Sequence, residues 1–413
     1  MGEILSSSAS CRYVIVGASL AGLSAAETLR SSGYEGQLVI IGAEEHRPYD
    51  RPPLSKQILN GQWSPEQVFL RKDADHDKLG AVWKLGRRAA GLDLRARAVI
   101  LQDGECIDFD GLVIATGATP RRLPGLAQLE GIHVLRTLDD AIAIRTRLEG
   151  NPRVCVVGAG FIGAEVAAAC RARGLEVTVI EALAAPLAHI LPPELASACV
   201  RLHLDHGVDM RCGATVEGFE GNGRVEAVRL SGGQRIPADL VIVGIGVVPE
   251  TGWLTSSGLA VDNGVLCDAT LATAVPGIVA AGDVARWPHA LFDETLRIEH
   301  WTNALDQGAA AARRLLFGDG YTQPFAPVPY VWSDQYETKI QMVGRIKPGD
   351  EVRLVHGSFE EGRFVALTGR AGRLVGALAF NEPRKLMGWR RPIEARTPWS
   401  DALANAGPSS RVG

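Results

Sequence analysis

One glycine pattern limits the possible folds of this chain more than any other feature. The apolar run at residues 154–157 is followed by G-x-G-x-x-G, whose glycines are Gly158, Gly160 and Gly163. Four apolar residues, three of them valine, predict a buried parallel strand. In the dinucleotide fold the first glycine forms a tight turn, the second admits a pyrophosphate, and the third packs helix on strand. A glycine motif alone could also be an ordinary tight turn between a strand and a helix, so the flanking residues must show whether it binds a dinucleotide.

The neighbours complete a dinucleotide-binding unit. Residues 164–173 are rich in alanine and predict a helix that Gly174 ends. A second apolar run at 177–180 predicts the next strand, and Glu181 ends it, 23 residues after Gly158. An acid there can accept a hydrogen bond from a ribose 2′-hydroxyl and would repel a 2′-phosphate. We therefore predict a nicotinamide dinucleotide site that favours NADH over NADPH.

The same pattern occurs earlier in the chain. A strand near 13–16 precedes Gly17, Ser19 and Gly22, with serine where the second glycine usually stands. Serine is small, so a pyrophosphate can still approach. After a second strand at 38–41, Glu44 is the expected ribose ligand. Two such units predict two dinucleotides, FAD in the first and a nicotinamide in the second; the alternative is one functional site and one degenerate copy.

Three further segments fit this arrangement. The proline-rich stretch 47–56 predicts an extended loop that enters a helix and carries Lys56, although it could be an ordinary connector. Residues 112–117 predict a buried strand that ends in Ala-Thr-Gly, and 240–249 predict the return strand of an inserted domain. The run T-x-x-P-x-I-x-A-x-G-D at 273–283 is more specific than its terminal Gly-Asp turn.

Composition excludes several classes of protein. With 46% hydrophobic and 22% charged residues, the chain is typical of a soluble globular protein. Its net charge of −4 gives no sign of nucleic-acid binding, and no apolar run reaches the roughly 18 residues of a membrane helix. We expect a cytoplasmic protein that is a monomer or a weak homodimer and binds neither membrane nor nucleic acid.

The cysteines argue against three kinds of redox or metal site. No two have C-x-x-C or C-x₄-C spacing, which disfavours a redox disulfide, a zinc site and a chain-borne iron–sulfur cluster. We predict no metal site, and we expect most cysteines to be packing residues in a reducing compartment. The seven are Cys11, Cys106, Cys155, Cys170, Cys199, Cys212 and Cys267.

At 413 residues the chain should contain two or three domains. We predict an FAD-binding domain in two parts, 1–117 and 244–324, with an NADH-binding domain at 118–243 inserted between them. From Phe325 alternating strands predict a C-terminal α+β domain with an antiparallel sheet over 325–413, whose last residues, 407–413, look disordered.

Four signatures carry a family resemblance that extends from Tyr13 to about Pro392. They are R-P-Y-D-R-P-P-L-S-K at 47–56, A-T-G-A-x-P-R at 115–121, I-E-x-W-x-N-A at 298–304 and W-S-D-Q-Y at 332–336. With them the chain resembles the FAD-dependent, NADH-linked ferredoxin reductases of bacterial monooxygenase and ring-hydroxylating dioxygenase systems. The resemblance implies an α/β, glutathione-reductase-like fold with two Rossmann-type domains and a C-terminal α+β domain.

The resemblance also implies roles for single residues. Lys56 and Glu165 resemble the catalytic pair beside the flavin, Arg136 and Asp283 resemble FAD ligands, and Glu299 resembles a residue near the nicotinamide. Trp301 resembles one at the flavin edge, and Trp332 resembles the aromatic between flavin and partner. The remaining expected cofactor-binding positions are Leu20, Ala21, Arg51, Ala89, Ala115, Thr116, Gly117, Phe161, Ile162, Gly244, Ile245, Gly246, Gly282 and His300; His300 could equally be a packed or surface histidine.

We therefore predict an enzyme that passes electrons from NADH through FAD to a small iron–sulfur ferredoxin. The stretch 370–396 holds seven basic and two acidic side chains, a net charge of +5, and could dock an acidic ferredoxin or be a solvated basic surface. The pair Arg313 and Arg314 is a second candidate docking site. Three hypotheses compete with this one. A disulfide reductase is opposed by the cysteine spacing, and a single-cysteine peroxide or NADH oxidase would need a cysteine near Ser55. The third is an NADH-sensing interaction module resembling apoptosis-inducing factor.

Overall fold

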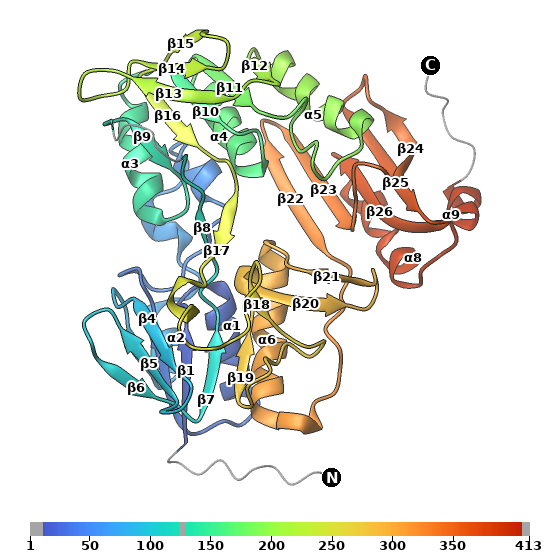
Figure 1. The fold of residues 1–413 in the computed structure, drawn as a ribbon. Coiled ribbons are helices and arrows are strands. Elements are labelled where there is room, and N and C mark those ends of the chain that lie inside the picture. The colour runs from blue at the N-terminus through green and yellow to red at the C-terminus, as the bar shows by residue number, and fades with distance from the viewer. Residues whose placement is uncertain (1–10, 124–128, 407–413) are drawn as a thin grey trace. The chain divides into compact units, whose positions relative to one another are not determined.

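The computed structural model describes residues 11–123 and 129–406, which fold into two compact units (Figure 1). Of the described residues, the first unit comprises 11–50, 69–119 and 248–327, and the second comprises 51–68, 120–123, 129–247 and 328–406. The expected disordered tail at 407–413 lies outside the described residues.

The first unit is built on a parallel five-stranded sheet in the order β19-β7-β1-β2-β3. Strand β1, which leads into the first glycine pattern, lies at its centre, and its last three residues are buried because both faces of the sheet are covered. The strands are β1 (Arg12–Val16), β2 (Gln37–Ile41), β3 (Ala81–Lys84), β7 (Gly111–Ile114) and β19 (Ile278–Ala280).

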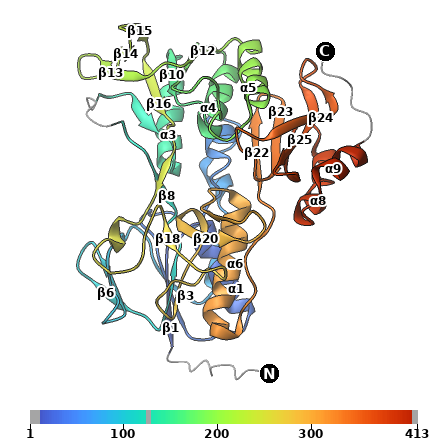
Figure 2. The same cartoon turned by 45° about the vertical axis from the view of Figure 1, so that its right-hand side comes forward.

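Two helices far apart in sequence pack side by side in this unit, α1 (Leu20–Ser31) and α6 (Trp301–Phe317), as both cartoon views show (Figures 1 and 2). The Ser24 hydroxyl donates to the Leu305 carbonyl at 2.7 Å. A Cβ at Gly308 would lie 2.4 Å from the Ala21 carbonyl oxygen, so only glycine permits this approach. Helix α6 is thereby held against α1, the helix that follows the first glycine pattern.

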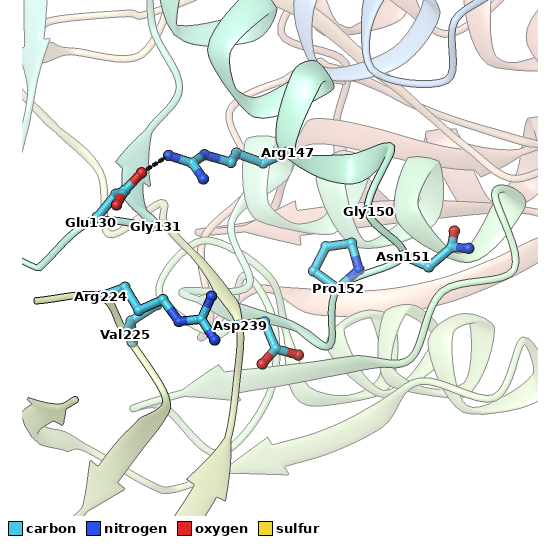
Figure 3. A pocket seen from close by; sticks show the side chains of 9 residues that line it. All are labelled: Glu130, Gly131, Arg147, Gly150, Asn151, Pro152, Arg224, Val225 and Asp239. Atoms are coloured by element: carbon cyan, nitrogen blue, oxygen red, sulfur yellow. Dashed lines mark hydrogen bonds and ion pairs between the residues drawn. The ribbon is translucent and has the colours of Figure 1, made fainter. Parts of the chain in front are cut away.

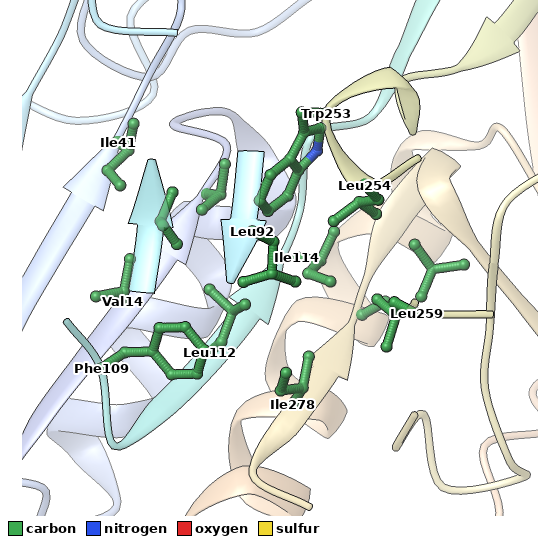
Figure 4. Packing of buried hydrophobic residues seen from close by; sticks show 14 of the residues in the cluster. Val14, Ile41, Leu92, Phe109, Leu112, Ile114, Trp253, Leu254, Leu259 and Ile278 are labelled. Carbon is green, nitrogen blue, oxygen red and sulfur yellow. The ribbon is translucent and has the colours of Figure 1, made fainter. Parts of the chain in front are cut away.

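The opposite face of the sheet is covered by an apolar cluster (Figure 4). Sheet residues such as Leu112 and Ile114 pack against Leu92 of a small antiparallel sheet and against Trp253 and Leu254 of a short 3₁₀ helix. The smaller elements of this unit are α2 (Asp73–Asp77), β4 (Ala89–Asp93), β5 (Ala98–Leu101), β6 (Cys106–Asp108), β18 (Val265–Leu266), β20 (Ala285–His289) and β21 (Glu294–Leu296).

The second unit holds another parallel five-stranded sheet, in the order β12-β11-β10-β16-β9. One buried cluster fills each face of this sheet, and Val156 and Val157 of β10 belong to opposite clusters. Its elements are β9 (Ile132–Val134), α3 (Leu138–Leu148), β10 (Val154–Val157), α4 (Phe161–Ala172), β11 (Val177–Glu181), α5 (Pro193–Asp205), β12 (Asp209–Cys212), β16 (Leu240–Val243) and the antiparallel β13 (Val216–Glu220), β14 (Ala227–Leu230) and β15 (Arg235–Pro237).

The same unit contains an antiparallel sheet in the order β22-β23-β26-β25-β24. Leu191 and Leu195 at α5 pack into one buried cluster with Phe364 and Phe380 of this sheet, so the C-terminal sheet and the second dinucleotide fold share a core. The elements are β22 (Tyr330–Gln335), β23 (Thr338–Gly344), β24 (Glu351–Ser358), β25 (Arg363–Arg370), β26 (Arg373–Phe380), α7 (Pro383–Met387), α8 (Arg390–Glu394) and α9 (Trp399–Ala406).

The predicted fold class is confirmed: the chain contains two Rossmann-type parallel sheets and a C-terminal α+β region. The chain crosses between the units at β8 (Ala118–Pro120) and β17 (Val247–Pro249). The loop at 47–56 continues into a π-helical turn, η1 (Leu54–Ile58), and a 3₁₀ turn, η2 (Pro65–Val68), follows it. The expected domain boundaries stay a prediction. Arg51–Val68, which lies within the expected first part of the FAD-binding domain at 1–117, folds with the second unit.

Candidate functional site

The first glycine pattern forms a tight cradle between β1 and α1. Gly17 has φ +121°, and a Cβ there would lie 2.0 Å from the Ala115 carbonyl oxygen. A Cβ at Gly22 would lie 1.9 Å from the Gly17 carbonyl oxygen. Neither position tolerates a side chain, which explains both glycines and places Ala115, of the Ala-Thr-Gly segment, against the turn.

The start of α1 is suited to a phosphate group. Ser19 precedes the helix and its hydroxyl makes no capping hydrogen bond, so the first backbone N–H groups, near Leu20 and Ala21, are left for another acceptor. The Gly282–Val284 turn lies close by, because a Cβ at Gly282 would be 3.1 Å from the Ala21 methyl carbon. The fold thus brings the Gly-Asp turn next to the first turn of α1, and the binding of an FAD pyrophosphate there stays a prediction.

Two residues of the proline-rich loop hold predicted site residues in place. The Tyr49 hydroxyl donates to the Glu44 carboxylate, and the Trp301 indole N–H donates to Asp50 at 2.6 Å. Glu44 and Trp301 are thereby oriented by neighbours, which favours rigid binding over an adaptable surface. The sequence identified the loop but not these two contacts.

The other predicted positions in the first unit have varied surroundings. The Thr116 hydroxyl donates to the Glu250 carbonyl at 2.8 Å, and Gly117 has φ +69°. Glu299 is exposed and pairs with Arg297 at 2.6 Å. The cofactor roles of these residues stay predictions, as do those of Ala89 in β4, Asp283 in its turn and His300 directly before α6.

The second glycine pattern repeats the cradle with one informative difference. Gly158 has φ +99° and a Cβ there would meet the Gly244 carbonyl oxygen at 2.4 Å, while a Cβ at Gly163 would meet the Gly158 carbonyl oxygen at 2.0 Å. A Cβ at Gly160 would meet nothing within 4 Å. Gly160 therefore faces open space at the helix start, which fits close approach by a ligand rather than by protein.

The acid at the end of β11 is anchored to this turn. Glu181 is only 9% exposed; its Oε2 accepts from the Ala159 N–H at 2.7 Å and its Oε1 from the Leu183 N–H at 2.9 Å. Each oxygen keeps a further lone pair for a ribose hydroxyl. Phe161 and Ile162 form the first turn of α4, and Ile162 is 46% exposed at its start.

The predicted catalytic pair is in direct contact. Lys56 Nζ lies 3.0 Å from Glu165 Oε1, and both side chains are largely buried. Two residues not anticipated from the sequence complete the cluster: Ser55 donates to Oε2 at 2.5 Å and Ser333 to Oε1 at 2.8 Å. The carboxylate thus accepts three hydrogen bonds, which offset the cost of burying an ion pair.

The remaining predicted positions in the second unit lie along its loops and strands. One guanidinium nitrogen of Arg51 donates to the Arg136 carbonyl at 2.5 Å. Gly244 packs against the Gly158 turn, and Ile245 and Gly246 follow it. Trp332 lies in β22 and stacks on Tyr330, with 5.8 Å between ring centroids. Cofactor contact by these residues stays a prediction.

A surface pocket of about 250 Å³ in the second unit is not the nucleotide site (Figure 3). Gly131, Pro152 and Asp239 line it, and they lie one or two residues before the starts of β9, β10 and β16. Dinucleotides bind at the carboxyl ends of such strands, which is the opposite edge of the sheet. Three of its charged side chains are also paired, since Arg147 pairs with Glu130, and Asp239 pairs with Arg153.

The cysteines do not assemble into a redox centre. All seven are free thiols. Burial raises the pKa of Cys155, Cys170 and Cys199 to about 12, which makes them poor nucleophiles. Within residues 11–123 and 129–406 no group of His, Cys, Asp and Glu could hold a metal ion, and no helix is long and apolar enough to cross a membrane.

Sequence reasoning missed four residues that hydrogen-bond to predicted site residues: Tyr49, Asp50, Ser55 and Ser333. A signal was present for each, because all four lie within the signatures 47–56 and 332–336. Spacing could not reveal them, since Ser333 reaches a carboxylate 168 positions away in the chain.

Comparison with known proteins agrees with this geometry. Residues 11–308 match the family described as pyridine nucleotide-disulphide oxidoreductase, and residues 330–409 match the reductase C-terminal family. Rhodocoxin reductase of Rhodococcus erythropolis is 38% identical over 387 residues, which cover 93% of this chain and 90% of that protein. The biphenyl dioxygenase system ferredoxin–NAD(+) reductase component of Paraburkholderia xenovorans is 36% identical over 401 residues, covering 96% and 97%.

A solved structure is similar over the same length. The covalent putidaredoxin reductase–putidaredoxin complex matches with a TM-score of 0.91 and 35% identity, covering 97% of this chain and 96% of that one. The predicted resemblance is confirmed, and so are the oxidoreductase class and the use of FAD and a nicotinamide dinucleotide. The chain belongs to the pyridine nucleotide-disulphide oxidoreductase family.

Proposed function

We propose that this protein is an NADH-dependent ferredoxin reductase that serves a bacterial monooxygenase or ring-hydroxylating dioxygenase. One observation carries the proposal: the chain has two complete dinucleotide cradles, while its cysteines are free and dispersed. Electrons from a nicotinamide therefore need an acceptor outside the chain. The relatives named above are reductases of this kind, and the similar solved structure is of one joined to its ferredoxin partner.

FAD supplies the chemistry that the side chains lack, since it takes two electrons from a nicotinamide and releases them singly. The first unit would hold FAD by the N-terminus of α1 for the pyrophosphate and by Glu44 for the ribose. The second unit would hold NADH by the N-terminus of α4 and by Glu181. Binding and orientation are thus the work of the two cradles.

Lys56 would supply a fixed positive charge at the reacting centre. Glu165, held by three donors, orients the ammonium group through their 3.0 Å contact. A preorganised charge of this kind stabilises electron density that develops during transfer, without reorganising at that moment. No side chain has to act as an acid or a base for the hydride transfer itself.

The ferredoxin would dock on a basic patch that we define as Arg384, Arg390 and Arg391, with Met387 among them. All four are exposed on α7 and α8, and the three arginines form no ion pair with any described residue. The patch is smaller than the predicted stretch 370–396, because Arg370 pairs with Asp350 at 2.6 Å and Lys385 lies 3.4 Å from the Glu382 carboxylate. Three exposed basic side chains attract an acidic partner at long range, which suits a small and transient redox contact.

The direct test is NADH-dependent reduction of a panel of 2Fe–2S and 3Fe–4S ferredoxins by the FAD-loaded protein. We expect at least one ferredoxin to be reduced many times faster than by NADH and free FAD. An NADH-sensing interaction module would instead bind NADH and reduce its flavin slowly, with no rapid transfer to any member of the panel. That result would replace the proposed function.

A further inference from the structure

The buried cluster around Glu165 draws on three separate parts of the second unit. Glu165 lies in α4, Ser55 and Lys56 lie in η1, and Ser333 lies in β22 of the C-terminal sheet. Glu165, Ser55 and Ser333 are 3%, 1% and 0% exposed. Ser333 is therefore the contribution of the C-terminal sheet to the ion pair between Lys56 and Glu165.

A neighbour on the same strand fixes the direction of the Ser333 hydroxyl. Gln335 is two positions along β22, on the same face, and its Nε2 donates to Ser333 Oγ at 3.0 Å. Because the oxygen is engaged as an acceptor, its hydrogen is left to point at Glu165 Oε1, 2.8 Å away. Asp334, between them, faces the other side and pairs with Lys339 at 2.7 Å.

The hydroxyl and the ammonium group share one carboxylate oxygen. Glu165 Oε1 accepts from both Ser333 and Lys56, while Oε2 accepts from Ser55. Without Ser333 the carboxylate could rotate, and a buried charge would lose a donor that no water replaces at 3% exposure. The position of the Lys56 ammonium group would then be less restricted.

We infer that Ser333 is a positioning residue: it locks the Glu165 carboxylate and, through it, places Lys56. The inference rests on the proposed function only for the role of Lys56 and not for the geometry. It also gives the C-terminal sheet a part in the NADH half of the reaction, whereas the proposed docking patch lies on α7 and α8.

The first test measures how fast the Lys56 amine reacts with an acetylating reagent, and it does not require the enzyme to turn over. An amine-acetylating reagent is applied to FAD-loaded protein and to protein stripped of FAD, and peptide mass spectrometry follows Lys56. Ser333→Ala should raise the labelling rate of Lys56 at least about threefold in both forms, with Lys72 and Lys347 unchanged as internal standards. The matched control is Thr368→Val, which removes a buried hydroxyl that has no partner among the described residues of the same sheet.

The second test is a double-mutant cycle on flavin reduction by saturating NADH in stopped flow. Ser333→Ala should slow the reduction about five- to twentyfold, with FAD content and the NADH Kd within twofold of the unmodified protein. In a Lys56→Met background the same substitution should slow it no further, because its effect acts through Lys56. Thr368→Val should leave the rate unchanged in both backgrounds.

The possible outcomes distinguish failure of the role assigned to Ser333 from failure of the proposed function. Equal Lys56 labelling in Ser333→Ala and unmodified protein overturns the inference, and so does a slowing that persists in the Lys56→Met background. Flavin that NADH does not reduce in the unmodified protein refutes the proposed function instead, and the labelling result still decides whether Ser333 positions Lys56. A lower thermal midpoint alone, with labelling and rate unchanged, would make Ser333 a purely structural residue.

Discussion

At the scale of single residues, the Glu181 carboxylate is held by its own turn before any ligand arrives. It accepts from the N–H groups of Ala159 and Leu183, so its position is fixed where a ribose 2′-hydroxyl would bind. The residues that follow, Ala182 to Ala185, offer no cation that could receive a 2′-phosphate. Selectivity for NADH would thus arise from repulsion as much as from attraction.

We therefore expect the unmodified protein to prefer NADH over NADPH by at least about tenfold in kcat/KM, or about 1.4 kcal/mol. Glu181→Gln should narrow the gap by removing the repulsion, and Glu181→Arg should narrow it further by adding a phosphate partner. Steady-state kinetics with ferricyanide as acceptor measures both. Equal use of the two cofactors by the unmodified protein would contradict the assigned role.

A buried histidine makes the second unit sensitive to acid. His203 in α5 is 1% exposed, and its Nδ1 lies 2.9 Å from the Tyr336 hydroxyl. Burial, with a smaller effect from nearby His206, lowers the pKa of His203 from 6.5 to about 4. The unfolded chain therefore takes up this proton at a higher pH than the folded one. Stability is full above about pH 6.5 and falls progressively toward pH 4.

The loss from this group should approach about 3 kcal/mol at pH 4, from about 1.4 kcal/mol per pKa unit. Thermal midpoints measured from pH 7 to pH 4 should fall less steeply in His203→Gln than in the unmodified protein. His189→Gln, which changes an exposed histidine, is the matched control and should keep the original slope. Parallel curves for all three proteins would exclude His203 as the source.

At the scale of elements, two glycines of the second glycine pattern serve different purposes: Gly163 is required by the packing of the fold, and Gly160 leaves room for a ligand. A side chain at Gly163 would collide with the Gly158 carbonyl, whereas one at Gly160 would enter open space. Both strand–turn–helix units could be predicted from the sequence, because glycine spacing and apolar runs are local signals. The π-helical form of η1 could not, since η1 contacts α3 and α4, which are distant in the sequence and leave no local pattern.

Two alanine substitutions should therefore affect different properties, one the binding of NADH and the other the stability of the fold. Gly160→Ala should raise the NADH KM at least about tenfold and leave the thermal midpoint within about 1 °C, because only the ligand would meet the new methyl group. Gly163→Ala should lower the free energy of unfolding by about 1–3 kcal/mol, the usual cost of overpacking. FAD content, measured by absorbance, should be retained in Gly160→Ala. A Gly160→Ala protein with normal NADH kinetics would argue against nucleotide binding at this turn.

At the scale of the whole molecule, the sequence predicts which modules are present better than it predicts their contacts. Lys56 and Glu165 could be paired only through the family resemblance, and Ser333 could not be added, because a hydrogen bond across 168 positions leaves no local pattern. The net charge of +5 counted over 370–396 likewise exceeds that of its unpaired side chains, because Asp350 pairs with Arg370 and no sequence pattern shows this pairing. Contacts between residues far apart in the sequence can be identified only in the folded structure.

The reduced basic patch gives the last prediction. Small redox contacts are short-lived, so long-range attraction sets the encounter rate, and salt shortens its reach to about 8 Å at physiological strength. The rate of ferredoxin reduction should fall as the salt concentration rises. The rate of ferricyanide reduction should change far less, because hydride transfer from NADH limits it. Replacing Arg390 and Arg391 by glutamine should raise the ferredoxin KM at least about fivefold and spare ferricyanide turnover. Arg95→Gln, at an exposed arginine of the first unit, is the control. Unchanged ferredoxin kinetics would move the docking site elsewhere, with exposed Arg313 next to be tested.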